Sequence, residues 1–241
     1  MTSVSQNSSC WYTRVMEKDI VYFVKESESN EELRYSLRSL KNFPHHRVWF
    51  YGGCPKELKP DYHVHVIQDK DNKWKNVSTM LDMVCKNKKI TKDFWLFNDD
   101  FFIMEKIEHP KNYYRGDLYK RIVQLEDKTG LTPYSQLLRD CAKECESLGV
   151  GTKDFSLHIP LKINRTNMLC LRHMTNFEGF RSLYGNCYIR TNCTMRDCKI
   201  TSTSKEYTEG CYLSTSDLSF EKGLVGKQIR EKFPDKCEYE L

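Results

Sequence analysis

The chain has 241 residues, 39% of them hydrophobic and 12% aromatic, which is enough apolar material for one packed core. Its formal net charge of +5 is spread along the sequence and not gathered in a tail, which argues against a dedicated nucleic-acid binder. Since no run of 18 apolar residues occurs and the N-terminal residues are polar, we expect a soluble, cytoplasmic protein without a membrane span or secretory signal.

Residues 1–15 are Ser-rich and lack an apolar pattern, so we expect a flexible leader before a single domain that covers 16–241. The odd number of cysteines, eleven, and their spacings fit no common zinc pattern, which favours mostly free thiols. One alternative stays open, a structural zinc site among four of them: Cys187, Cys193, Cys198 and Cys211.

The first elements in chain order form a strand-helix-strand unit. A β-branched and aromatic run over Asp19–Val24 predicts a strand. Ser29 and Glu32 have the spacing of a capping box, and Leu33, Leu37 and Leu40 follow at helical intervals. Arg47–Tyr51 predicts the next strand, which ends at two glycines, Gly52 and Gly53, and such a crossover is parallel and right-handed.

The same alternation continues over the next 45 residues. We expect a third strand over His63–Ile67, a helix over Asn76–Asn87 and a fourth strand over Phe94–Phe97. The pattern predicts an α/β fold with a mostly parallel sheet flanked by helices. Ligands of such sheets bind beyond the carboxyl ends of the strands, so Lys25, Gly52-Gly53 and Asn98–Asp100 are expected to share one crevice.

The second half of the sequence is less regular. Helices are expected from Leu118 to Gly130 and from Thr132 to Leu148, as a helical insertion at about 115–150. Shorter elements are predicted at the positions that follow: an extended segment at Phe155–Pro160, a helix near Arg165–His173, loops at Phe180–Asn186 and Leu213–Asp217, and a terminal helix at Gly226–Phe233.

The acidic pair Asp99-Asp100, preceded by Asn98, stands between two blocks of four apolar residues. Burying ionised carboxylates is costly unless a cation or hydrogen bonds compensate. A divalent metal or a metal-nucleotide would supply that compensation. The alternative is that the pair only forms a turn after the strand, because Asn and Asp are common turn residues.

Several of these segments, taken in order, resemble the Stealth family of sugar-phosphate transferases. The run Asp19–Tyr22 looks like the first block of the family, Asn30–Ser39 looks like the start of the second, and Asn98–Asp100 looks like its end. His158 and Arg181 are similar to the histidine and arginine of the third and fourth blocks. The usual Trp-Val-Asp-Gly element after the first block is here Phe23–Glu26.

The resemblance implies a glycosyltransferase A-like core, a nucleotide-sugar donor and a Mg²⁺ or Mn²⁺ ion. In this scheme Asp99 and Asp100 bind the metal, Asp100 also takes part in catalysis, and His158 acts as general base. Arg181 stabilises charge on the transferred phosphoryl group. The alternatives are a hydrogen-bonded core position for His158 and a loop salt bridge for Arg181.

Four further residues are expected to bind the donor: Lys25, Arg38, Asn76 and Asn98. Arg38 and Arg34 lie one helical turn apart, and a guanidinium there can hold a phosphate bidentately or remain an exposed surface charge. Asn76 precedes the apolar face of its helix, so an N-cap is the competing interpretation.

Three functions follow as hypotheses. The first is metal-dependent transfer of a sugar-1-phosphate from a nucleotide-sugar to the hydroxyl of an acceptor. The second is glycosyl transfer at the anomeric carbon onto a glycan, a protein or a modified DNA base. The third is a non-catalytic basic module that binds nucleic acid and whose acidic pair is only structural.

Overall fold

The computed structural model describes residues 18–175, 177 and 179–241, and the expected leader lies outside this part of the chain. A central sheet of five strands has the order β3-β2-β1-β4-β6. Its first four members run parallel, and only β6 pairs antiparallel, with β4. The prediction of an α/β fold with a mostly parallel sheet is therefore confirmed. The strands are β1 (Asp19–Val24), β2 (Val48–Gly52), β3 (Tyr62–His65), β4 (Asp93–Phe97) and β6 (Leu161–Asn164).

Both faces of this sheet are covered, as a parallel sheet requires. Successive residues of β1 point to opposite faces, so Val21 joins one apolar cluster and Ile20 and Tyr22 join another. The Val21 face packs against α2 (Lys73–Lys86), α5 (Arg165–Met174) and α6 (Phe180–Tyr188). The Tyr22 face packs against α1 (Glu31–Ser39) and its 3₁₀ extension, η1 (Leu40–Asn42).

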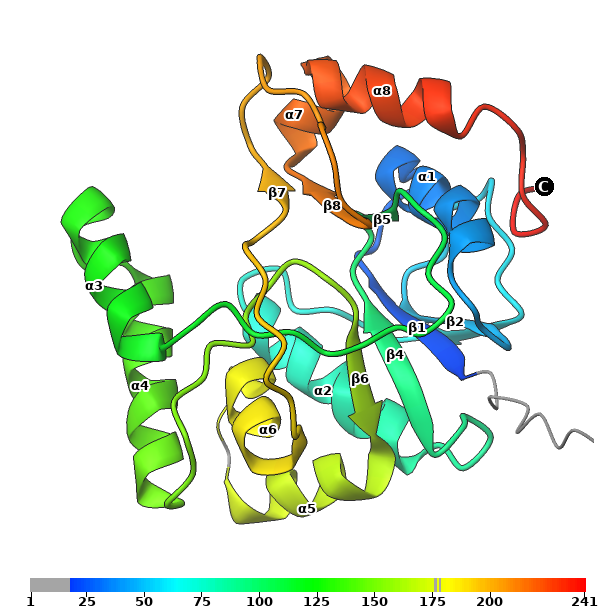
Figure 1. The fold of residues 1–241 in the computed structure, drawn as a ribbon. Coiled ribbons are helices and arrows are strands. Elements are labelled where there is room, and N and C mark those ends of the chain that lie inside the picture. Colours follow the sequence, from blue (N-terminus) through cyan, green and yellow to red (C-terminus); the bar gives the residue numbers. More distant parts are fainter. Residues whose placement is uncertain (1–17, 176, 178) are drawn as a thin grey trace, which may run out of the picture.

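A second, three-stranded sheet lies beside α1 in Figure 1. It has the order β5-β8-β7, where β5 is Phe101–Ile103, β7 is Lys199–Ile200 and β8 is Tyr212–Thr215. Phe102 on β5 and Phe220 on α7 stack within a third apolar cluster. The helices α7 (Asp217–Lys222) and α8 (Leu224–Lys232) thus close this sheet on the side away from the central one (Figure 1).

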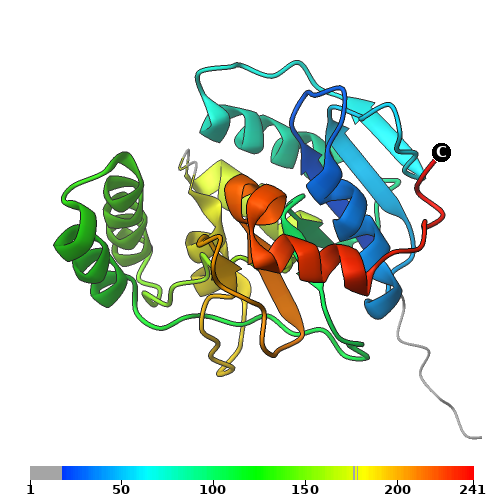
Figure 2. The same cartoon turned by 90° about the horizontal axis from the view of Figure 1, so that it is seen from above.

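A helical hairpin projects from the opposite side of the molecule, as Figure 2 shows. It consists of α3 (Leu118–Thr129) and α4 (Pro133–Ser147). Gly130 ends α3 with φ at 69°, and Thr132 with Ser135 forms a capping box that starts α4 at Pro133. Both predicted helices of the insertion are confirmed.

Four local predictions need correction. Asn30, not Ser29, caps α1, because its side chain accepts from Leu33 N. Asn72, not Asn76, caps α2, which begins three residues earlier than expected. The expected loops at Phe180–Asn186 and Leu213–Asp217 belong to α6 and to β8 with the start of α7. None of the helices in the described part of the chain has the length and apolar character that a membrane span requires.

Candidate functional site

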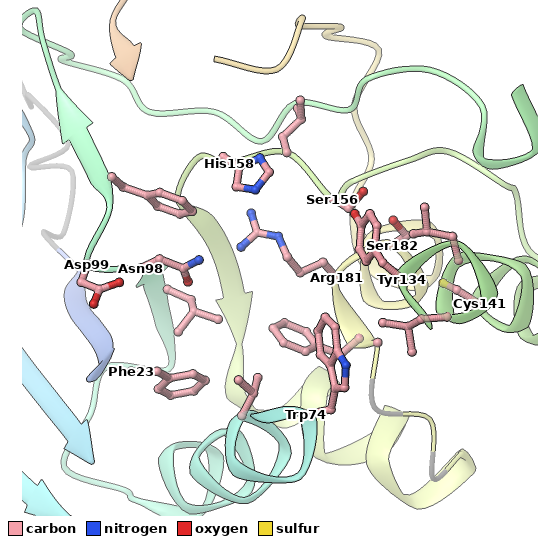
Figure 3. A pocket seen from close by; sticks show the side chains of 18 residues that line it. Phe23, Trp74, Asn98, Asp99, Tyr134, Cys141, Ser156, His158, Arg181 and Ser182 are labelled. Atoms are coloured by element: carbon pink, nitrogen blue, oxygen red, sulfur yellow. The ribbon is translucent and has the colours of Figure 1, made fainter. Parts of the chain in front are cut away.

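A cavity of about 350 Å³ opens at the carboxyl ends of β1 and β4, between α2, α4 and α6. Figure 3 shows its side chains from close by. Four of the eight residues predicted as site residues line it, and together they place polar and charged groups in a mostly apolar pocket: Asn98, Asp99, His158 and Arg181. A cavity therefore lies beyond the strand ends, but of the residues expected to share it only Asn98 and Asp99 line it; Lys25, Asp100 and the two glycines at the end of β2 do not.

His158 forms a dyad with Asp197. The imidazole Nδ1 lies 2.9 Å from Asp197 Oδ2, and the backbone N–H of His158 donates to Oδ1 at 3.0 Å. Burial alone would raise the pKa of Asp197, but its hydrogen bonds with His158 and the charge of Arg115 lower it well below the ordinary value. Since an ionised carboxylate only accepts, Nδ1 carries a proton, and in the neutral form of this imidazole Nε2 is the nitrogen with the free lone pair.

Asp197 is itself held by a second cation. Arg115 Nη2 lies 2.5 Å from Asp197 Oδ2, and its Nε lies 3.7 Å from the buried carboxylate of Asp154. Asp154 in turn accepts from Ser156, which lines the cavity. Asp197, which orients the imidazole of His158, is thus itself held in place by Arg115. This arrangement can position a general base.

Arg181 extends its guanidinium into the middle of the cavity, between His158 and Asn98 (Figure 3). Nη2 donates to Ile159 O at 2.6 Å and Nε donates to Phe155 O at 3.4 Å. No carboxylate among the described residues forms an ion pair with it, and burial lowers its pKa to about 10. A half-buried guanidinium without a charged partner favours an anionic ligand. The alternative considered for Arg181, a loop salt bridge, does not occur among the described residues, where Arg181 belongs to α6.

Asp99 faces the cavity on the other side, at the end of β4 (Figure 3). Its Oδ2 accepts from Asn30 Nδ2 at 2.9 Å, so the residue that caps α1 also orients this carboxylate. Burial raises the pKa of Asp99, and the charge of Asp100 adds to the shift although the Asn30 hydrogen bond opposes it. A cation beside Asp99 would relieve this cost.

Asp100 lies behind the cavity and does not line it. Its Oδ2 accepts from Lys199 Nζ at 2.9 Å and from Ser214 Oγ at 2.8 Å, both on the second sheet. The acidic pair is therefore divided: Asp99 faces the ligand cavity, whereas Asp100 connects β4 to β7 and β8. The catalytic role expected for Asp100 has no support in this geometry.

Three predicted donor-binding residues lie elsewhere. Arg38 is buried and pairs bidentately with Glu240, with both N–O distances at 2.7 Å, and also donates to Phe233 O and Pro234 O. Asn76 bonds the backbone of Asp69 through both side-chain atoms and so fixes the loop before α2. Lys25 is exposed after β1. For Arg38 and Asn76 the hydrogen-bonding groups that a donor would use are already engaged.

Sequence reasoning missed Asp197, Trp74 and Tyr134. Asp197 stands in an irregular segment 39 residues beyond His158, so no local pattern connects the two. Trp74 lies in the basic stretch Lys70–Lys75, which suggests exposed surface, but its indole forms one side of the cavity. For Trp74, the only signal in the sequence is the presence of an aromatic residue within a run of charged residues.

The donor atoms of the cavity determine which kind of metal binding it can support. No group of three or more His, Cys, Asp or Glu side chains in the described part of the chain could hold an ion. Mg²⁺, however, is commonly bound by one or two carboxylates together with substrate phosphates. Asp99, which lines the cavity and whose pKa is raised by burial, fits that mode of binding.

Comparison of the chain with protein-family models gave no match, and comparison with curated proteins gave no relative. The assignment of function therefore depends on the residues of the cavity.

Proposed function

We propose that this protein is a transferase that uses a nucleotide-sugar donor and moves a sugar-1-phosphate to the hydroxyl group of an acceptor. The observation that carries the proposal is the Arg181 guanidinium, which has no carboxylate partner among the described residues and lies in one cavity with Asp99 and with His158, the imidazole held by Asp197. An anion-binding cation, an oriented base and a carboxylate suited to a metal are the groups that phosphoryl transfer uses. The glycosyltransferase A-like core belongs to the proposal, supported by the mostly parallel sheet with its cavity at the strand ends.

In the proposed reaction, Nε2 of His158 accepts the proton of the acceptor hydroxyl. The acceptor oxygen forms a bond to the phosphorus that carries the sugar, and the bond from this phosphorus to the bridging oxygen breaks. The nucleoside monophosphate leaves with that oxygen. Asp197 stabilises the imidazolium that forms, and Arg181 stabilises the charge on the phosphoryl oxygens.

A Mg²⁺ or Mn²⁺ ion bound with the donor would neutralise charge on the diphosphate. Asp99 is the residue that would hold it, and Asn30 keeps this carboxylate oriented toward the cavity. Asp100 contributes indirectly, because its bonds with Lys199 and Ser214 fix the backbone that follows β4.

The test is a screen of nucleotide-sugars with Mg²⁺ or Mn²⁺ in which the released nucleotide is identified by chromatography. Release of a nucleoside monophosphate is expected; release of the diphosphate would instead show glycosyl transfer. Arg181→Ala should lower turnover about 10²–10³-fold and weaken donor binding. Arg190→Ala, which removes an exposed arginine beyond the end of α6, is the matched control and should have no effect.

Absence of nucleotide release from every donor, or full turnover by a folded Arg181→Ala protein, would contradict the proposal. Salt-dependent nucleic-acid binding without any response to nucleotide-sugars would favour the binding-module hypothesis.

A further inference from the structure

The cavity has a second side that the proposed chemistry does not use. α2 contributes Trp74 and Val77, and α4 contributes Leu137, Leu138 and Cys141. Figure 3 shows Trp74, with Phe23 of β1, at one end of the cavity and His158 at the other, with the Arg181 guanidinium between them. The cavity is therefore amphipathic, with one charged end and one apolar end.

Several side chains at the apolar end are still open to solvent. Phe23, Trp74, Val77 and Leu137 are only half-buried, although each lines the cavity. Water in contact with such side chains is released when an apolar group covers them, which makes this end a favourable site for hydrocarbon or aryl groups.

We propose that the apolar end is the subsite for the apolar part of the acceptor, which is then a hydroxyl-bearing molecule with an aliphatic or aryl group. The assignment of this occupant as the acceptor rests on the proposed function. Its hydroxyl group would lie near His158, while the apolar group extends past Arg181 toward Trp74.

The composition of this end argues against the nucleobase of the donor as its occupant. A nucleobase carries hydrogen-bond donors and acceptors around its ring, and burying them without partners is unfavourable. Val77, Leu137 and Leu138 offer none, and the Tyr134 hydroxyl is already hydrogen-bonded with Ser156. The indole N–H of Trp74 is a donor without the matching acceptors that a nucleobase edge needs, whereas Asn98, Asp99, His158 and Arg181 supply both kinds of group around the charged end.

Calorimetric titration with a series of alkyl phosphates, from methyl to octyl, tests the subsite without any transferase assay. The phosphate binds Arg181 and the chain reaches the apolar end, so affinity should rise by up to about fourfold for each methylene group that becomes buried. Leu137→Asp should abolish this dependence on chain length while methyl phosphate still binds. Leu131→Asp, at a position 69% exposed between α3 and α4, is the matched control and should change neither.

Trp74→Ala is the second variant and should weaken octyl phosphate binding more than methyl phosphate binding; melting curves identify any unfolded protein. Equal affinity for all chain lengths, or a chain-length dependence that survives in both folded variants, would overturn the subsite. If Leu137→Asp weakens the binding of nucleoside monophosphates as strongly as the binding of octyl phosphate, the apolar end binds the donor. The proposal that the acceptor occupies it would then be wrong. If affinity depends on chain length but no nucleotide-sugar is turned over, the subsite is retained and the proposed function is rejected. If a nucleotide-sugar is turned over but affinity is equal for all chain lengths, the proposed function is retained and the subsite is rejected.

Discussion

Three carboxyl groups lie near the carboxyl end of β4, and the environment of each defines what it can do. Asp99 accepts from Asn30, Asp100 from Lys199 and Ser214, and Glu32 on α1 from Thr215. Burial raises the pKa of Glu32 to about 7, and the charges of Asp99 and Asp100 add to the shift although the Thr215 hydrogen bond opposes it. Lys199 pairs with Asp100, whereas the charges of Asp99 and Asp100 both act on Glu32, so protonation of Glu32 relieves repulsion in this region.

The raised pKa of Glu32 leads to a pH-dependent prediction. The pKa of Glu32 is about 7 in the folded protein, against an ordinary value of 4.5. Such a carboxyl group contributes stability to the folded state at pH values below 4.5, and this contribution is lost as the pH rises through 7. Glu32→Gln keeps a hydrogen-bonding side chain without the charge. It should therefore stabilise the protein by about 2 kcal/mol at pH 8 and have little effect at pH 5.

Thermal melting at the two pH values measures this difference, and the neighbouring Glu31 supplies the control. Hydrogen bonds from Arg230 lower the pKa of Glu31, so Glu31→Gln should reduce stability at pH 8. A Glu32→Gln protein that is destabilised equally at both pH values would show that the carboxylate is needed for structure.

Single substitutions of Asp99 and Asp100 should have different effects on binding and on stability. Asp99→Asn should remove Mn²⁺-dependent nucleotide binding and leave the melting temperature nearly unchanged, because burial already disfavours its charge. Asp100→Asn leaves the Lys199 ammonium without its carboxylate and should cost about 2 kcal/mol of stability, with metal-dependent binding retained per folded molecule. Calorimetry and melting curves together distinguish the two, and identical behaviour of both variants would contradict the division.

At the scale of elements, those with a clear period and a local start signal could be predicted from the sequence. β1 has an uninterrupted apolar run, and α4 has Thr132 and Pro133 at its start, so both were identified close to their true bounds. The predicted N-cap of α1 differs from the observed one by one residue because Asn and Ser are both common N-cap residues, so the sequence does not distinguish Asn30 from Ser29. Only the orientation of the side chain decides between them.

The missed elements depend on tertiary contacts. α6 has no side-chain cap and contains Gly185, so its sequence carries no helix signal; the glycine is needed because Phe155 packs directly on it, where a Cβ atom would come within 2.2 Å of the ring. β8 is four residues long and pairs with β5, which lies more than a hundred residues earlier. Neither packing on a distant ring nor long-range pairing leaves a periodic signal.

The same limit applies to the candidate site. Asn98 and Asp99 could be placed in it because they directly follow an apolar strand, and His158 and Arg181 because they resemble family residues. Asp197 could not, since a partner so distant in sequence becomes visible only when the chain is folded. Arg38 was assigned wrongly to the donor for the same reason, because its partner is Glu240.

At the scale of the whole molecule, the Arg38–Glu240 pair connects α1 to the C-terminal segment. The backbone of Tyr239 and Leu241 also bonds the loop after β2, through Lys59 and Glu57. The pair is buried, with the side chains of Arg38 and Glu240 9% and 3% exposed. Figures 1 and 2 both show this segment beside α1 and the edge of the central sheet.

Because removing one partner leaves a buried charge uncompensated, Arg38→Met should destabilise the protein by about 3–5 kcal/mol. Arg34→Met, one turn earlier in α1, removes a more exposed ion pair with Glu31 and should cost less than about 1 kcal/mol. Denaturant unfolding measures both values. Nucleotide-sugar affinity per folded molecule should be unchanged in the Arg38→Met protein, since Arg38 does not line the cavity; a stable variant with lost donor affinity would instead return Arg38 to the donor site.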